Sequence, residues 1–177
     1  AAVLKKDSFN VRILDANALG LQIEGIIKYI KQYKPNIVGL TAMTPTIKSV
    51  HFLAQKIKKT MPEIKIIIGG VHATKLPQDT LKRFPAFDVI ALNEGESIIS
   101  GLVEALHNNQ DLSSIDGISY RYKEEIKEKP GRLIQDLDSI PFPARELLPM
   151  HLYRSVVSSK FTTIIAMRGC YAHCNYC

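Results

Sequence analysis

The sequence has no tryptophan, and aromatic residues make up only 7% of it. Proteins that stack nucleic-acid bases need aromatic platforms, so this scarcity argues against base binding. The net charge is +6, but no block of like charges is present. The lysines are spread along predicted helices, which indicates solvated faces and no nucleic-acid partner. These lysines are Lys28, Lys31, Lys34, Lys48, Lys56, Lys58, Lys59 and Lys82.

Long apolar runs are also absent. No stretch is long enough to cross a membrane, and no signal-peptide pattern is found. We therefore expect no membrane span. Hydrophobic residues make up 46% of the 177 residues and charged residues 23%, which is typical of a globular protein with one core.

Cysteine is absent until residue 170 and then occurs three times, as Cys170, Cys174 and Cys177. The spacing is C-x3-C-x2-C, and it follows a predicted strand over 161–167. Thiolates are soft ligands, and close spacing on one loop lets them bind different irons of one cluster. Three thiolates leave one iron open to a small molecule. The pattern predicts an iron–sulfur cluster, and reduced thiols favour the cytoplasm.

Other uses of these cysteines are less favoured by the spacing. A zinc ion would need His173 as fourth ligand, but His173 is adjacent to Cys174, which is poor geometry for joint coordination. A disulfide would leave one cysteine over. Three buried structural thiols remain the plain alternative, and the clustering argues against it.

Upstream of the cysteines, apolar strand-like stretches alternate with helical patterns, and the strands recur roughly every 25 residues. This alternation predicts an α/β protein: a Rossmann-like (flavodoxin-like) parallel sheet with helices on both faces. Residues 1–6 have the pattern of a helix end. Predicted strands cover 11–15, 37–41, 64–68 and 88–92; predicted helices cover 21–33, 45–57 with Thr44 as N-cap, 78–84 and 95–106.

Ligands of such sheets bind outside the carboxyl ends of the strands, which we call the rim. The expected contacts at the rim are Asp15, Asn17, Gly20, Thr41, Met43, Thr44, Gly69, Gly70, His72, Glu94, Gly95 and Glu96. Glycine lets a ligand approach the backbone closely, and a helix N-terminus favours anions. Each residue also has a plainer reading: a turn at Gly69 and Gly70, a cap at Thr44, a hydrogen-bonded loop histidine at His72, and solvated carboxylates at Glu94 and Glu96.

The residue pattern changes after residue 110, and this change predicts that the chain has three parts. Residues 1–110 form the Rossmann-like domain. Residues 111–160 form a connector with a small exposed hairpin over 118–129 and an extended proline-rich stretch over 136–143. Residues 161–177 begin a third unit with the cysteine loop.

The cysteine loop resembles the cluster motif of radical S-adenosylmethionine enzymes. Arg168 and Gly169 precede the first cysteine, and the aromatic Tyr176 precedes the last. The resemblance implies a [4Fe-4S] cluster whose open iron binds S-adenosylmethionine. It also implies a reducing electron donor such as a flavodoxin or ferredoxin, and cleavage of S-adenosylmethionine to a 5′-deoxyadenosyl radical. The strand over 161–167 would then be the first of a truncated (β/α) barrel.

The order of the three parts resembles that of cobalamin-dependent radical S-adenosylmethionine enzymes. The connector carries a D-L-D-x-I-P-x-P-A-R pattern from Asp136 to Arg145, and the segments 14–17, 39–42, 68–72 and 93–96 are similar to that family's cobalamin-binding domain. The family usually has glycine where Asn93 stands. The resemblance implies cobalamin as a cofactor, with methyl transfer or oxidative cyclisation on a small-molecule substrate. Catalytic acids and bases are not assigned.

Two alternatives from other classes stay open. The chain could be a cobalamin- or nucleotide-binding module without catalysis, or an iron–sulfur electron-transfer protein. For this chain alone we expect no activity, because substrate-binding residues would lie in the barrel.

The stretch Asp15 to Gly20 departs from a related pattern. Cobalamin mutases carry D-x-H-x-x-G, whose histidine binds cobalt, whereas Asn17 occupies that position here. An amide is a weak cobalt ligand compared with imidazole. We therefore expect cobalamin to bind with no protein imidazole on cobalt.

The chain begins without methionine, inside a helical pattern, so we expect it to be a piece of a longer protein. The resemblance to the cobalamin-dependent family implies a strand and most of a helix before Ala1. In a 2-1-3-4-5 sheet that strand would lie between 11–15 and 37–41. Both strands would then face a gap. Exposed strand edges are usually avoided, so the chain alone is expected to be unstable, to borrow a strand, or to be part of a longer protein.

Overall fold

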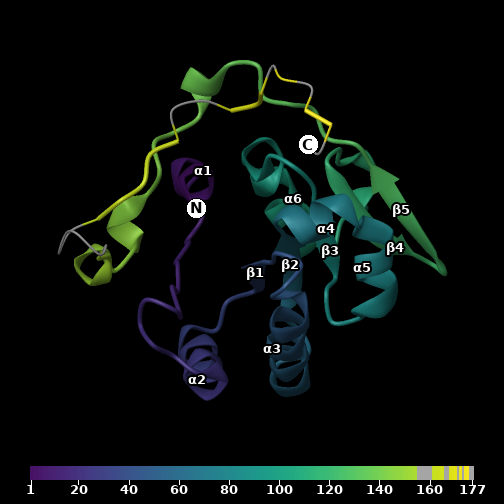
Figure 1. The fold of residues 1–177 in the computed structure, drawn as a ribbon. Coiled ribbons are helices and arrows are strands. Elements are labelled where there is room, and N and C mark those ends of the chain that lie inside the picture. The colour runs from purple at the N-terminus through teal and green to yellow at the C-terminus, as the bar shows by residue number, and fades with distance from the viewer. Residues whose placement is uncertain (155–160, 166–167, 171, 173, 176–177) are drawn as a thin grey trace.

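A computed structural model describes residues 1–154, 161–165, 168–170, 172 and 174–175 (Figure 1). Within them a single mixed sheet has the strand order β1-β2-β3-β4-β5. β1, β2 and β3 are parallel, and β4 and β5 are antiparallel to their neighbours. The strands are β1 (Ile37–Thr41), β2 (Lys65–Gly69), β3 (Val89–Ala91), β4 (Ile118–Tyr122) and β5 (Glu125–Lys129).

The described helices are α1 (Ala2–Lys6), α2 (Ile23–Tyr33), α3 (Ile47–Thr60), α4 (Val71–Lys75), α5 (Pro77–Arg83) and α6 (Ile99–His107). Short 3-10 turns are Gly95–Ser97, Leu112–Ser114, Leu137–Ser139, Arg145–Leu147 and Met150–Leu152. The predicted α/β fold class with a Rossmann-like sheet is confirmed. No helix in the described part of the chain is long and apolar enough to span a membrane.

The sheet is apolar on both faces, as expected for a strand covered by helices on each side. In β2, Ile66 and Ile68 pack into one cluster with α3 and α5, and Ile67 packs into a second cluster with α6. All three isoleucines are buried. Full burial of each contributes about 1.5–3 kcal/mol. This two-sided burial explains why β2 is a continuous apolar run rather than an alternating one.

Two predicted strands are wrong. Residues 11–15 and 161–165 have no strand structure, and residues 166–167 of the second lie outside the described part. Both runs are rich in strand-forming residues, but a strand forms only where a neighbour supplies hydrogen bonds. Ile164 and Ile165 are 79% and 81% exposed. The 11–15 segment runs outside the sheet, so it does not pair with β1 (Figure 1).

The hairpin over 118–129 is confirmed, but the expectation that it is exposed is wrong for β4. β4 pairs with β3, which places Ile118, Ser119 and Tyr120 in the interior. The reason is that β3 would otherwise present an open edge. The predicted division at residue 110 stays a prediction, although the sheet itself continues past it into the hairpin.

The predicted start of the second long helix is also wrong, because α3 begins at Ile47 with Thr46 as its N-cap residue. The hydroxyl of Thr44 lies 3.1 Å from Nδ1 of His72, so it is engaged across the rim rather than with its own helix. The predicted helix over 95–106 begins with a 3-10 turn, and α4 was not predicted.

Candidate functional site

The carboxyl ends of β1, β2 and β3 meet at one edge of the sheet, as predicted. Thr41 at the end of β1 pairs with Gly69 at the end of β2, and β3 ends at Ala91 beside them. Short loops follow each strand. They therefore bring together most of the predicted site residues: Thr41, Met43, Thr44, Gly69, Gly70, His72, Glu94, Gly95 and Glu96.

Gly70 lies where the loops after β1 and β2 cross. Its φ is +91°, and a Cβ atom there would lie 2.6 Å from Oγ1 of Thr41 and 2.7 Å from the carbonyl oxygen of Ala42. The N–H of Ala42 donates to the carbonyl of Gly69, and the N–H of His72 donates to that of Ala42. Only glycine fits both the conformation and the space. Gly69 has ordinary room, with Ala91 oxygen at 3.6 Å.

His72 is nearly buried behind this crossing, with 6% of its surface exposed. Its Nδ1 contacts Thr44, whereas its Nε2 is buried and has no hydrogen-bond partner within the described residues. Buried polar atoms are nearly always paired, so an unpaired one marks a place where a partner is expected.

Asp15 lies outside the sheet, because no strand forms over 11–15, and hydrogen bonds hold both of its carboxylate oxygens. Its Oδ1 accepts from the N–H of Ala18 at 2.9 Å, and its Oδ2 accepts from the hydroxyl of Tyr153 at 2.5 Å. These hydrogen bonds, chiefly the one from Ala18, hold the pKa of Asp15 below its usual value. The same contact raises the pKa of Tyr153. Asn17 and Gly20 lie in the turn that follows, exposed to solvent.

Glu94 and Glu96 lie at the rim, and both contact Arg168. Nη1 of Arg168 lies 3.1 Å from Glu94, and Nη2 lies 2.6 Å from Glu96. The second oxygen of Glu94 accepts from the N–H of Ile134 at 2.7 Å. The pKa of Glu94 is lowered, first by that backbone hydrogen bond and then by Arg168.

Asn93 has a φ of +53°, in the left-handed region that favours glycine. Asparagine tolerates this region better than most residues. The N–H of Asn93 donates to Oγ1 of Thr74. The departure at Asn93 therefore preserves the backbone conformation that a glycine would adopt.

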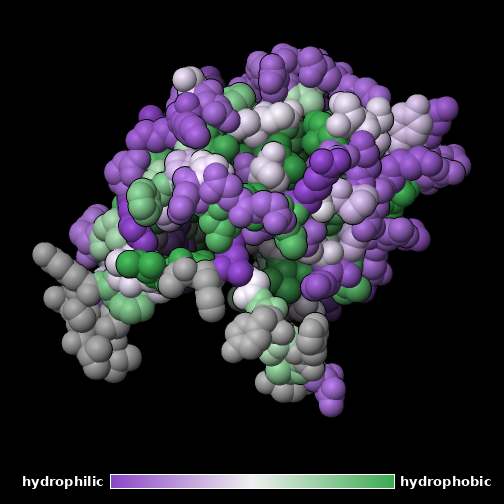
Figure 2. All heavy atoms as spheres, turned by 90° about the horizontal axis from the view of Figure 1, so that it is seen from above, coloured by the Kyte–Doolittle hydropathy of each residue, from purple (hydrophilic) through white to green (hydrophobic). Residues whose placement is uncertain are grey.

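Apolar side chains also stand exposed at the rim. Met43 is 61% exposed and Val71 67% exposed, each two residues past paired strand ends. Leu19 lies 43% exposed in the loop with Asn17. Seen from above, the surface is a mixture of polar and apolar side chains rather than one continuous patch (Figure 2).

The cysteine loop is described only in part. Cys170 and Cys174 are exposed and free, and the N–H of Ala172 points to Sγ of Cys170 at 3.4 Å. Cys177 and His173 lie outside the described residues. Among those that are described, no three metal-binding side chains come together.

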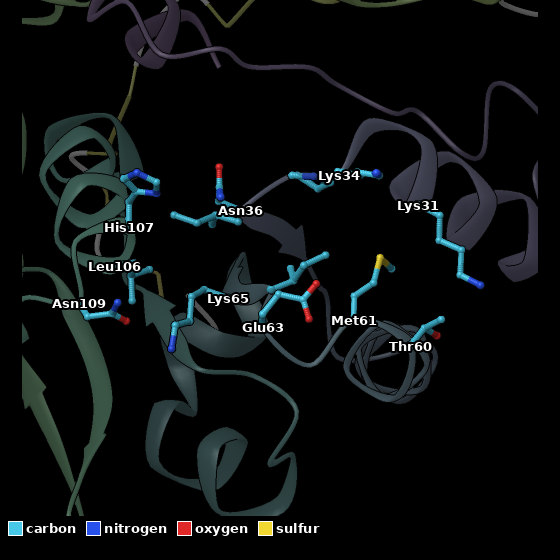
Figure 3. Close-up of a pocket in the computed structure, with 13 residues that line it drawn as sticks. Lys31, Lys34, Asn36, Thr60, Met61, Glu63, Lys65, Leu106, His107 and Asn109 are labelled. Atoms are coloured by element: carbon cyan, nitrogen blue, oxygen red, sulfur yellow. The ribbon is translucent and has the colours of Figure 1, made fainter.

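A hollow of about 540 Å³ lies at the opposite end of the sheet, before β1 and β2. Lys31, Lys34, Lys65 and His107 are among its lining residues. Figure 3 shows these lysine side chains pointing in different directions rather than toward one point. The hollow therefore lacks the convergent charge of an anion site.

Comparison with known proteins decides the family. The model of the B12 binding domain matches residues 1–103. The chain belongs to the B12-binding domain family. The predicted relationship with cobalamin-dependent radical S-adenosylmethionine enzymes is thereby confirmed at the level of its cobalamin-binding domain.

The relatives and solved structures agree with this assignment. An uncharacterized methyltransferase of Pyrococcus horikoshii, PH0819, is 33% identical over 99% of this chain and 38% of its own length. The anaerobic magnesium-protoporphyrin IX monomethyl ester cyclase of Synechocystis is 32% identical over 95% of this chain and 34% of its own. The B12-binding chain thus spans well under half of these relatives.

The fold matches that of OxsB, a cobalamin-dependent S-adenosylmethionine radical enzyme solved with aqua-cobalamin bound. The TM-score is 0.72 at 24% identity, covering 82% of this chain and 20% of OxsB. This likeness supports the Rossmann-like architecture.

Two residues that hydrogen-bond to predicted site residues were not predicted from the sequence. Tyr153 binds Asp15, and Arg168 binds Glu94 and Glu96. Arg168 was noticed as part of the cysteine motif, but nothing in its local pattern indicated carboxylate partners more than 70 residues away. Tyr153 carried no signal at all.

Proposed function

We propose that the rim binds cobalamin and that the parent protein is a cobalamin-dependent radical S-adenosylmethionine enzyme. The observation that carries this proposal is the B12-binding match over residues 1–103, the same residues whose strand ends build the rim. A small-molecule substrate is expected, with methyl transfer or oxidative cyclisation as the outcome, as the printed names of the relatives suggest for those proteins.

The chemistry of the rim fits a corrinoid. Exposed Met43 and Val71 offer apolar surface to a large flat ring. Gly70 has no side chain, so nothing projects from the backbone where the two loops cross. Nε2 of His72 lacks a partner. Polar groups near these residues suit the cofactor's amides, ribose and phosphate. The full set of proposed contacts is Asp15, Asn17, Gly20, Thr41, Met43, Thr44, Gly69, Gly70, His72, Glu94, Gly95 and Glu96.

Asn17 occupies the position where cobalamin mutases have a cobalt-binding histidine. It lies exposed in the turn after Asp15, and its amide is a weak ligand compared with imidazole. The proposal is therefore that no side chain of this chain coordinates cobalt strongly. Bound cobalamin would supply a cobalt centre able to carry a methyl group.

Cys170, Cys174 and Cys177 would hold a [4Fe-4S] cluster with one open iron for S-adenosylmethionine. Such a cluster would need a reducing donor such as a flavodoxin or ferredoxin. Thiolates survive in a reducing compartment, which is why the proposal places the protein in the cytoplasm.

The test is a spectrophotometric titration of the full-length protein with hydroxocobalamin, followed by electron paramagnetic resonance of the cobalt(II) form. We expect saturable uptake of one corrinoid and no nitrogen hyperfine splitting from a protein imidazole. The absence of corrinoid uptake in this titration would refute the proposal. Splitting from a histidine would refute the role given to Asn17.

A second measurement separates an enzyme from a binding module. Anaerobic reconstitution of the full-length protein with iron and sulfide should allow cleavage of S-adenosylmethionine to 5′-deoxyadenosine. A Cys170→Ala variant should lose this cleavage and retain corrinoid uptake. Corrinoid uptake without any cleavage in the native protein would favour the non-catalytic alternative.

A further inference from the structure

We propose that Arg168 is a positioning residue: its ion pairs with Glu94 and Glu96 seat the cysteine loop against the rim. We call these three residues the clasp. The benefit of the clasp for catalysis rests on the proposed function, but the contact itself does not.

The clasp joins segments that are far apart in sequence. Arg168 uses both terminal nitrogens, one for each carboxylate, at 3.1 Å and 2.6 Å. The planar guanidinium presents its donors in a fixed fork, so two acceptors define its orientation as well as its position. A lysine would supply the charge without the fork.

Glu94 is itself fixed before it meets Arg168. Its side chain is only 17% exposed, and its other oxygen accepts from the N–H of Ile134. A small hollow of about 250 Å³ beside Glu96 is lined by Val3 of α1 and by Ile134 and Pro141 of the connector. The carboxylates therefore stand in a corner built from three parts of the chain rather than on a free loop.

Arg168 is close in sequence to the first cysteine, so the clasp restricts where that cysteine can lie. Cys170 follows two residues later, and two residues of extended chain span roughly 7 Å. Holding Arg168 therefore limits how far the first thiolate can move from the rim. Gly169 between them has a φ of +80°, a turn that directs the chain after Arg168.

This assignment changes the expected role of Glu94 and Glu96. As free carboxylates at the rim they would be candidates for direct cofactor contact. With Arg168 between them, one of their two negative charges is offset, and both oxygens of Glu94 and one oxygen of Glu96 are engaged. The clasp predicts that they act on the cofactors through the placement of the cysteine loop.

Zero-length cross-linking tests the contact in cofactor-free full-length protein. In an Arg168→Lys variant, a water-soluble carbodiimide should join the new amine at position 168 to Glu94 or Glu96, as identified by mass spectrometry. Adding Glu94→Gln and Glu96→Gln should abolish that cross-link. An Arg132→Lys variant serves as control, because Arg132 has no ion pair among the described residues and should give no cross-link to either glutamate.

The absence of the cross-link, or its formation with other carboxylates, would overturn the clasp. This outcome is independent of cobalamin and iron, so it is distinct from a failure of the proposed function.

The placement of the loop is tested in the protein loaded with both cofactors. An Arg168→Met variant should retain full iron content and corrinoid affinity within about twofold, while the magnetic coupling between cobalt(II) and the reduced cluster changes. Arg168→Lys should restore this coupling in part. Unchanged coupling in Arg168→Met would show that Arg168 does not position the loop, and loss of corrinoid affinity alone would make it a cofactor ligand instead.

Discussion

At the scale of single residues, Gly70 is the position where the rim permits least change. An added Cβ would meet Thr41 and Ala42 at under 3 Å, and the φ of +91° strains any other residue. We expect Gly70→Ala to lower the free energy of unfolding by roughly 2–3 kcal/mol. Gly101→Ala is the matched control, because Gly101 lies in α6 with nothing within 4 Å, and helix propensity should raise stability by up to about 1 kcal/mol. Urea denaturation measures both, and equal stabilities would contradict the crossing geometry.

The Asp15–Tyr153 hydrogen bond should make stability depend on pH. The folded state lowers the pKa of Asp15, so its contribution is full above the unfolded value, about 4, and is lost as the pH falls through the folded value. The raised pKa of Tyr153 means that its contribution is present below about pH 10 and lost at higher pH. Tyr153→Phe should therefore lower the melting temperature at neutral pH, and the difference from the native protein should shrink below about pH 4. A difference that is the same at pH 3 and pH 7 would show that the contact does not form.

At the scale of elements, Arg121 ties the hairpin to the helical layer. From β4 it donates to the carbonyl oxygens of Leu81, Phe84 and Phe87, at the end of α5 and before β3. Arg121→Met should destabilise the protein by about 1–2 kcal/mol, because charged hydrogen bonds are strong and the arginine is still partly solvated. Thermal unfolding measures this change. Arg132→Met, on an exposed loop, should have little effect, and equal losses in both variants would contradict the assigned role of Arg121.

Local patterns predicted the elements whose residues show a clear helical period or a long apolar run. The 3.6-residue spacing placed α2 and α3, and the continuous apolar run placed β2. The patterns over 11–15 and 161–167 also contain strand-forming residues, but strand structure depends on a neighbour that no local pattern reports. The start of α3 differs from the prediction for the same reason, since Thr44 contacts His72 of α4.

The same distinction between local and distant contacts applies to the candidate site. Residues at strand ends could be predicted, because the carboxyl ends of parallel strands must share one edge. The partners of Asp15, Glu94 and Glu96 could not be predicted, because Tyr153 and Arg168 reach them only after the connector has turned back over the rim.

At the scale of the whole molecule, the connector runs across the side of the sheet where the rim lies (Figure 1). Tyr153 of the connector binds Asp15, and Arg168 of the following segment binds Glu94. The rim also carries Met43 and Val71 beside the crossing at Gly70. These side chains are exposed, so the part of the rim around Gly70 is open to a ligand.

Hydrogen exchange of the full-length protein, with and without hydroxocobalamin, tests the central claim that this rim is the cobalamin site. The account predicts slower exchange in the peptides that carry residues 15–20, 42–46 and 70–74, and unchanged exchange at the opposite end of the sheet around Asn36 and Glu63. Protection confined to that opposite end, or none despite corrinoid uptake, would contradict it.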